Sequence, residues 1–348
     1  MNLTLREARP ATAAEWDAVW TACPYATYFH SRAWSEDWST YTRGSLVPAP
    51  ELVTFSDERR ALLPITRQLR RRGLAVRNIL SPAGTYGGWL ADEPLETAHA
   101  QLLTAWLLAK RVPLWWRVNP FDPLAAVPAQ EATEPDVTHL LPVERDAEGR
   151  CENVTHSQRS AVNKARRAGL VVRHATSAAD WEVYFSIYEN TLARWGDTAS
   201  ARYGAELFEL LRRRGEPGVT LWLTELQDGP IVAGAITLSA PHHVAGWHMA
   251  TLADYFRLKP NNLMVHEIAE DACQRSLSWF DMNPSGGHKG VQEFKERCGG
   301  QPLACPVIVK DTPWTRAVAA AGAVAARLRG VNGGEAREPD GSGEAAGD

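Results

Sequence analysis

The sequence of 348 residues lacks any run of about 18 or more uncharged apolar residues, which a helix needs to span a bilayer. Its first ten residues, MNLTLREARP, lack the basic and then apolar layout of a secretory signal. The five cysteines are scattered without a C-x-x-C pair, so we expect neither a disulfide framework nor a zinc site. These absences predict a cytoplasmic protein without integral membrane contact.

Lysine is also scarce, because only six of the 37 basic residues are lysine. Two of the six, Lys289 and Lys295, lie in one short segment at residues 278–300.

The excess of acidic over basic residues is confined to residues 331–348, whose five acids and one arginine account for the net charge of −4. This Gly-, Glu- and Ala-rich segment cannot bury an apolar face, so we expect a disordered acidic tail after a terminal helix at residues 313–330.

An internal repeat is the main sign of domain organisation. A helix start, a strand–turn–strand and a helix–strand unit recur in the same order, 164 to 169 residues apart. The copies are EWDAVW (15–20) and DWEVYF (180–185), the strands at 52–66 and 221–238, and the helix–strand units at 102–120 and 266–284. We therefore predict two similar domains, at residues 1–145 and 146–312. The order of elements predicts an α+β fold, in which each domain has a mixed sheet with helices on its faces.

The second copy ends in a segment that ordinary packing does not explain. In SWFDMNPSGGHKGVQEFKERCGG (278–300) an apolar strand ends at Asp281, a glycine turn follows, and Lys295 stands before another glycine pair. A compact ammonium there has two chemical uses, which are to stabilise an oxyanion that develops during a reaction or to neutralise a phosphate of a ligand. The plain alternative is an exposed loop lysine. Asp281 either accepts a proton from a substrate or caps N–H groups of the loop.

A second candidate site is the turn RLKPNN (257–262), which precedes a helix. The N–H groups and the positive dipole end of that helix can hold a phosphate, with Lys259 and Asn262 beside it. Acetyl-CoA enzymes cradle pyrophosphate on a glycine-rich turn, whereas this turn has no glycine and Pro260 removes one donor. The turn therefore weakens the case for a standard CoA site without excluding one.

Residues 246–300 resemble the C-terminal half of the Fem family, which are aminoacyl-tRNA-dependent peptidyltransferases built from two fused GNAT-like (acetyltransferase-type) domains. The shared pattern is an aromatic strand ending in Ala-Thr, a Pro-Asn turn, a Phe-Asp strand end, a glycine loop, and Gly-x-x-x-Phe-Lys before a glycine pair. Here these pieces stand at 250–251, 260–261, 280–281, 286–287 and 290–300. Likeness at residues 26–38, 81–90, 156–172 and 191–203 extends the match over most of residues 20–310.

The resemblance implies site residues as well as a fold. The Phe-Lys pair lies at the acyl-donor pocket of the family, which implies a catalytic Lys295 with Asp281 beside it. The implied contacts to the donor are Phe294, Lys289, Arg297, Lys259, Asn262, Gly286 and Gly287. The implied contacts to the acceptor are Arg159, Arg194, Tyr203, Trp247 and His248. The alternatives are surface ion pairs for the arginines and core packing for the aromatic residues. Along the strand at 243–252 we expect successive residues to face the crevice and the core in turn.

Two departures set the chain apart from members that build cell-wall cross-bridges. The charged insertion with a 3.5-residue period that forms a helical-hairpin arm in those members is missing. Cys298 replaces the aromatic residue that usually follows the Phe-Lys motif. Both differences favour an acceptor other than a cell-wall cross-bridge peptide.

Three functions are consistent with the sequence. The first is transfer of an aminoacyl group from aminoacyl-tRNA to an amine of a small metabolite, a peptide or a peptidoglycan precursor. The second is acyl-CoA-dependent N-acyl transfer on the same fold, and the third is a non-catalytic RNA- or protein-binding module. The turn at 257–262 favours the first over the second, and the Phe-Lys segment favours an enzyme over the third. We expect no metal and no bound cofactor, because the charged tRNA is a co-substrate.

Overall fold

The computed structural model describes residues 3–70, 75–143, 145, 156–196, 201–277 and 279–312. The predicted terminal helix at 313–330 and the acidic tail at 331–348 lie outside these residues. Contacts within the chain divide it into two compact units. The first unit contains the residues up to Cys23, Phe29–Pro135 and the strand Val307–Lys310, and the second contains Pro24–Tyr28 and Asp136–Ala304. No helix in the described part of the chain is long and apolar enough to cross a membrane.

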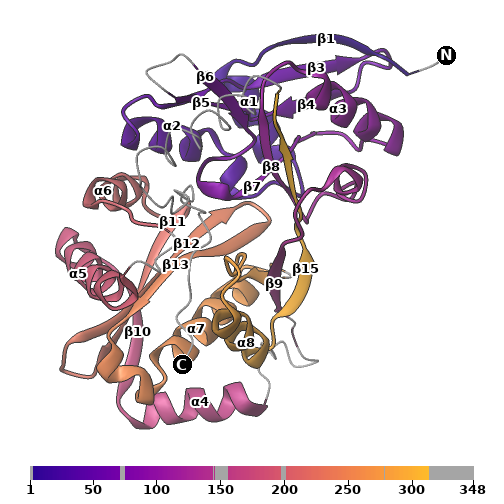
Figure 1. Cartoon of the computed structure of the whole chain (residues 1–348). Coiled ribbons are helices and arrows are strands. Elements are labelled where there is room, and N and C mark those ends of the chain that lie inside the picture. The colour runs from indigo at the N-terminus through magenta and orange to yellow at the C-terminus, as the bar shows by residue number, and fades with distance from the viewer. Residues whose placement is uncertain are drawn as a thin grey trace, which may run out of the picture. The chain divides into compact units, whose positions relative to one another are not determined.

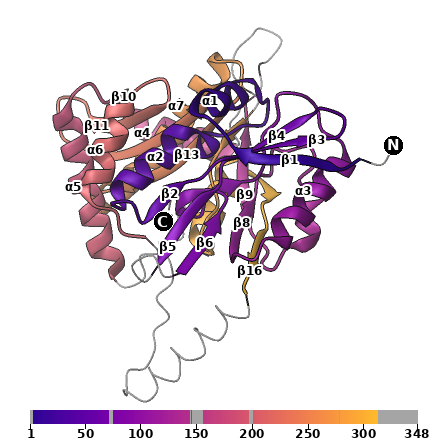
Figure 2. The ribbon, with the colours of Figure 1, turned by 90° about the horizontal axis from the view of Figure 1, so that it is seen from above.

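The first unit contains two sheets. Its elements are β1 (Leu5–Pro10), α1 (Ala13–Ala22), α2 (Arg32–Tyr41), β2 (Leu46–Pro48), β3 (Glu51–Phe55), β4 (Arg60–Leu63), β5 (Thr66–Arg70), β6 (Ala75–Ile79), β7 (Tyr86–Gly87), α3 (Thr97–Ala109), β8 (Leu114–Val118) and β16 (Val307–Lys310). One sheet has the order β1-β3-β4, and the other has the order β16-β8-β6-β5-β2, with β7 beside β8. Figure 2 shows β5, β6 and β8 side by side.

The second unit has one seven-stranded sheet, in the order β10-β11-β12-β13-β14-β9-β15. Its elements are β9 (Val137–Pro142), α4 (His156–Arg167), β10 (Leu170–His174), α5 (Ala178–Trp195), α6 (Ala205–Arg214), β11 (Val219–Leu226), β12 (Ile231–Ala240), β13 (His243–Thr251), α7 (Pro260–Gln274), β14 (Trp279–Asp281), α8 (Lys289–Cys298) and β15 (Gln301–Ala304). Strands β10 to β13 form an antiparallel meander (Figure 1), and α7 connects β13 to the parallel strand β14.

The predicted repeat is confirmed. The order β1-β3-β4 with α1 after the first strand recurs as β10-β11-β12 with α5 after the first strand. The helix–strand pair α3 and β8 recurs as α7 and β14. The second unit begins at Asp136, ten residues before the predicted start at 146, because β9 pairs with β14 and β15. The described residues contain no helical-hairpin arm, and α5 and α6 pack on each other and on the sheet.

Helices α5 and α7 cover opposite faces of the second sheet. On β12, Ala233 and Ala235 share a core with α7 residues such as Val265. A side chain on Gly234, between these alanines, would instead lie against Tyr184 of α5. Because successive strand residues point to opposite faces, the two helices must lie on opposite sides of β12.

Strand β13 contains a bulge that breaks this alternation. Its pairing with β12 runs from Ala240↔His243 to Thr237↔Gly246 and resumes at Ile236↔His248, so Trp247 is inserted between them. Its parallel pairing with β14 covers only Val244↔Phe280 and Ala245↔Asp281 and ends just before the bulge. Bulges twist and bend a strand and are frequent beside active sites. Strands β13 and β14 therefore diverge from Gly246 onward.

The cysteines differ from the expectation in one respect. Cys23, Cys298 and Cys305 are free, buried thiols, whereas Cys273 in the core of the second unit is disulfide-bonded. One bonded cysteine is not the disulfide framework that the sequence analysis excluded, but the spacing of the cysteines gave no sign of this pairing, because it does not report distance in space.

Candidate active site in the second unit

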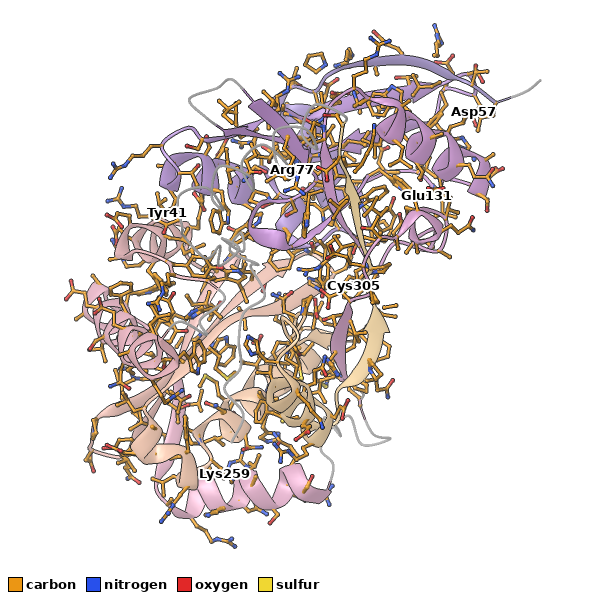
Figure 3. All side chains as sticks on the ribbon, in the orientation of Figure 1. Tyr41, Asp57, Arg77, Glu131, Lys259 and Cys305 are labelled. Carbon is orange, nitrogen blue, oxygen red and sulfur yellow. The ribbon has the colours of Figure 1, made fainter. Side chains whose placement is uncertain are left out.

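The turn before α7 forms one wall of a cavity of about 220 Å³. Lys259 caps the helix in the left-handed conformation, with φ of 66°, and Pro260 follows at the first helical position. The lining residues come from α4, from this turn and from α8, and they are Ser157, Gln158, Ala161, Phe256, Lys259, Pro260, Asn261, Asn262, Phe294 and Arg297. Figure 3 shows Lys259 beside α4. A helix N-terminus with a lysine and an arginine beside it attracts an anion.

A reciprocal amide pair holds two walls of this cavity together. The buried Gln158 of α4 donates from Nε2 to the carbonyl oxygen of Asn262 over 2.8 Å. Asn262 donates from Nδ2 to Gln158 Oε1 over 2.7 Å. The side chain of Asn262, which the sequence analysis assigned to an anion, is thus used to join α7 to α4. Cys298 donates its thiol to the same Gln158 Oε1 over 3.5 Å, and burial raises the pKa of that thiol to about 12.

Lys295 lies on α8 rather than in a loop, and it is completely buried. Its ammonium donates to the carbonyl oxygen of Asn283 over 2.7 Å and to that of Pro284 over 3.3 Å. The segment that carries these carbonyls turns back toward the helix because Asn283, Gly286 and Gly287 all have positive φ, from 56° to 80°. The glycines permit this conformation without strain. The two glycines assigned to donor binding therefore shape the loop that orients Lys295.

Lys295 also lines a second, smaller cavity, which lies between β13 and β14. This cavity of about 20 Å³ is lined by Ala235, Gly246, His248, Met249, Val265, Ile268, Phe280, Met282 and Lys295. Except for His248 and Lys295 its walls are apolar. A cation in such surroundings interacts strongly with a developing negative charge, because little water screens it.

Asp281 is buried at the end of β14 but lines neither cavity. Its Oδ1 accepts from Thr138 Oγ1 over 2.7 Å and from the Asn283 N–H over 2.8 Å. Its Oδ2 lies 3.2 Å from His243 Nε2. Asp281 thus caps an N–H of the loop, as the second alternative stated.

The sequence analysis did not identify Asn283 and Ser285 as site residues. Both are buried, and neither Asn283 Oδ1 and Nδ2 nor Ser285 Oγ has a hydrogen-bond partner among the residues that the structure describes. Buried polar atoms without a partner are rare and call for a ligand or an ordered water. They stand beside the carbonyls that hold Lys295, so they extend its polar surroundings. Their position directly after a strand end was a signal that the sequence analysis did not use.

Three of the predicted basic residues are Arg194, Arg159 and Lys289, and only the first of them lies near a cavity. The guanidinium of Arg194 lies 4.8 Å from the ring centre of Phe256, which lines the larger cavity. Arg159 is exposed on α4 and lines neither cavity. The side chain of Lys289 is 88% exposed and lies 3.9 Å from a carboxylate oxygen of Glu293. The structure thus brings Arg194 to the site and leaves the other two on the surface.

The bulge places the aromatic residues differently from the expected alternation. Both Trp247 and His248 contact Tyr203, with ring centres 5.3 Å and 6.2 Å apart. Consecutive residues of β13 therefore face the same side, because the inserted residue shifts the alternation by one position. Tyr203 and Trp247 are buried in packing, as the structural alternative stated. The described residues contain no group of three or more histidine, cysteine or acidic side chains placed to hold a metal ion.

Comparisons with known proteins agree with this architecture. Residues 153–296 match the family model of the acetyltransferase (GNAT) domain. The crystal structure of FemX aligns with a TM-score of 0.65 at 12% identity, over 87% of this chain and 97% of FemX. The C-terminal domain of a candidate lysylphosphatidylglycerol synthetase from Agrobacterium fabrum aligns with a TM-score of 0.53 at 13% identity, over 90% of this chain and 97% of that one. No curated protein matches the sequence. The Fem-like tandem GNAT fold is therefore confirmed.

Proposed function

We propose that the protein transfers an aminoacyl group from aminoacyl-tRNA to an amine of a small metabolite, a peptide or a peptidoglycan precursor, and so forms an amide bond. One observation carries the proposal: the fully buried Lys295 lines a cavity between two strands of an acyltransferase-type domain. A buried lysine is costly unless its charge is used or compensated. The similarity in fold to FemX supports the same class of reaction.

In this reaction the nucleophile is the substrate amine, so the protein has to stabilise the charge of the transition state and does not supply a nucleophile. The amine nitrogen attacks the ester carbonyl, a C–N bond forms, and the carbonyl π electrons move onto oxygen. Lys295 stabilises this oxyanion, an effect that is typically worth a factor of roughly 10²–10³ for one donor. The intermediate then expels the ribose oxygen, which receives through water the proton that the nitrogen loses. Each bond made or broken belongs to a substrate, so the protein supplies position and charge.

The larger cavity is the proposed site for a phosphate of the donor. Lys259 and Arg297 line it at the N-terminus of α7, and Arg194 stacks on its wall residue Phe256. Side chains of this kind bind phosphate oxygens in a salt-dependent way. Asn283 and Ser285, with their buried polar atoms, would contact polar atoms of the acyl group beside Lys295.

Acyl-CoA is the second candidate donor, because the family model that matches residues 153–296 is an acetyltransferase domain. The turn before α7 argues against it. A CoA pyrophosphate is normally bound by backbone N–H groups of a glycine-rich turn, whereas here Lys259 and Pro260 occupy the turn and proline offers no N–H.

Radiolabelled aminoacyl-tRNA pools incubated with the full chain and amine acceptors test the proposal. We expect label to move to the acceptor, and treatment of the tRNA with RNase beforehand to abolish the transfer. Transfer from acyl-CoA that is indifferent to RNase would establish the second candidate instead. Binding of RNA or of a protein partner without transfer from either donor would identify a non-catalytic module.

A further inference from the structure

His248 is the one neutral polar side chain among the residues that line the smaller cavity, and aromatic rings enclose it on the other side. It follows the bulge of β13 and is only 7% exposed. Ring centres of neighbouring aromatic side chains lie 4.6 to 6.2 Å from its own, and these belong to Tyr184, Tyr188, Tyr203, Phe208 and Trp247. The imidazole therefore cannot rotate freely, and its two nitrogens have different surroundings.

Tyr184 of α5 determines which nitrogen faces the cavity. Its hydroxyl oxygen lies 2.5 Å from His248 Nδ1, which is a short hydrogen bond. Within the described residues His248 makes no other hydrogen bond. Since Nδ1 is occupied on the side of α5, Nε2 is the nitrogen left to contact a molecule in the cavity.

Burial determines where the protons are. It lowers the pKa of His248 to about 3, so the imidazole is neutral at physiological pH. It raises the pKa of Tyr184 well above its usual range, so the phenol keeps its proton. The phenol has one acceptor in contact, His248 Nδ1, and therefore donates to it. A neutral imidazole that accepts at Nδ1 carries its own proton on Nε2.

Gly234 makes the contact between Tyr184 and the sheet sterically feasible. A Cβ atom at this position of β12 would lie 2.4 Å from Tyr184 Cδ2, which is far inside van der Waals contact. The glycine thus leaves room for the Tyr184 ring on β12, from which its hydroxyl reaches His248 on the neighbouring strand β13.

We propose that His248 is a catalytic residue that stays neutral and donates a hydrogen bond from Nε2 to the carbonyl oxygen of the acyl donor, with Tyr184 as the positioning residue that selects this tautomer. The inference rests on the proposed acyl transfer. As the amine nitrogen bonds to the carbonyl carbon, the π electron pair moves to oxygen and the hydrogen bond from Nε2 strengthens. No proton leaves His248. This assigns the residue to the donor and not to the acceptor, where the resemblance had placed it.

A role as general base is disfavoured by the same surroundings. Accepting a proton would create an imidazolium in an apolar cavity that already contains the ammonium of Lys295. A histidine with such a low pKa is also too weak a base to take a proton from the attacking nitrogen. A neutral hydrogen-bond donor, in contrast, acts on the oxyanion without any change in its own protonation.

Variants that separate these roles are His248→Leu, which removes the donor, and His248→Gln, whose amide keeps an N–H donor near the position of Nε2. We expect His248→Leu to lower kcat by roughly 10²–10³-fold with little change in KM, and His248→Gln to restore at least about a tenth of the wild-type rate. Tyr184→Phe should give an intermediate loss, because the tautomer is no longer selected. His242→Gln, at an exposed turn, is the matched control and should leave the rate unchanged. Thermal unfolding of each variant reports whether it is folded.

Two further measurements do not depend on the variants. The pH profile of kcat should show no step from a histidine between about pH 5 and 8, where an ordinary histidine titrates. The other titratable groups near the ring are the phenols of Tyr184, Tyr188 and Tyr203 and, across the cavity, the amine of Lys295. Nitrogen-15 NMR of labelled histidine should show a neutral ring protonated at Nε2, without any substrate.

The outcomes distinguish failure of this inference from failure of the proposed function. Transfer by the wild type together with an unimpaired His248→Leu variant would overturn the inference alone, as would a ring protonated at Nδ1 or charged near neutral pH. If acyl-CoA is the donor, the same variants test the same hydrogen bond, because ester and thioester share the carbonyl group. A folded wild type that transfers from neither donor would overturn both proposals.

Discussion

Replacing Lys295 by methionine tests the centre of the proposed site. Methionine has a similar length and no charge, so the change removes the ammonium while keeping most of the packing of α8. Loss of one preorganised oxyanion donor typically lowers kcat by roughly 10²–10³-fold, which corresponds to about 2.7–4 kcal/mol of transition-state stabilisation. We expect a loss of this size in amide formation from the charged tRNA, and a smaller change in KM.

The effect of Lys295→Met on stability should be small, because two contributions oppose each other. The variant loses hydrogen bonds to the carbonyl oxygens of Asn283 and Pro284, at 2.7 and 3.3 Å. Hydrogen bonds from a charged donor contribute about 1.5–3 kcal/mol each. Burying the ammonium, however, costs several kcal/mol that methionine does not incur. The free energy of unfolding should therefore change by less than about 3 kcal/mol, so the variant stays folded.

The assay is the initial rate of label transfer, measured beside urea unfolding of the same preparations. Lys164→Met, at an exposed position of α4, is the matched control and should retain both activity and stability. A folded Lys295→Met variant with a rate within about threefold of the wild type would show that the buried ammonium is structural, and the proposed chemistry would lose its main support.

Three further changes test other parts of the structure. Burial raises the pKa of Asp122 to about 6, so the folded state prefers the protonated carboxyl and stability should fall as pH rises from about 4 to 6. Asp122→Asn should remove this trend and raise the free energy of unfolding by up to about 3 kcal/mol near pH 8, as measured by urea denaturation; an unchanged trend would contradict it. Gly234→Ala should push Tyr184 off β12 and lower the free energy of unfolding by about 1–3 kcal/mol, visible as a lower Tm, and a neutral effect would refute the close contact. Gln158→Leu leaves the amide of Asn262 unpaired and should raise KM for the donor several-fold in steady-state assays, whereas an unchanged KM would separate the larger cavity from donor binding.

Local sequence patterns determined much of the fold. In the structure the repeated helices are α1 and α5, and the repeated hairpins are β3–β4 and β11–β12. The repeated helix–strand units are α3–β8 and α7–β14. Such features follow from apolar periodicity and turn residues, which act over neighbouring positions of the chain. The motif around Lys295 pointed to a segment that the structure buries beside a cavity, since a lysine between glycine turns is unusual in a chain with so few lysines.

Only the tertiary structure decided what that segment does. Asp281 became a cap because Thr138, from a strand 143 residues earlier, donates to it. His248 contacts Tyr184, 64 residues away, because a bulge turns it toward α5 and because Gly234 leaves room for the tyrosine ring. Burial, protonation and hydrogen-bond partners arise from contacts between distant parts of the chain. The sequence alone therefore determined which elements form, while long-range packing decided which side chains are buried, which line the cavities and which partners they have.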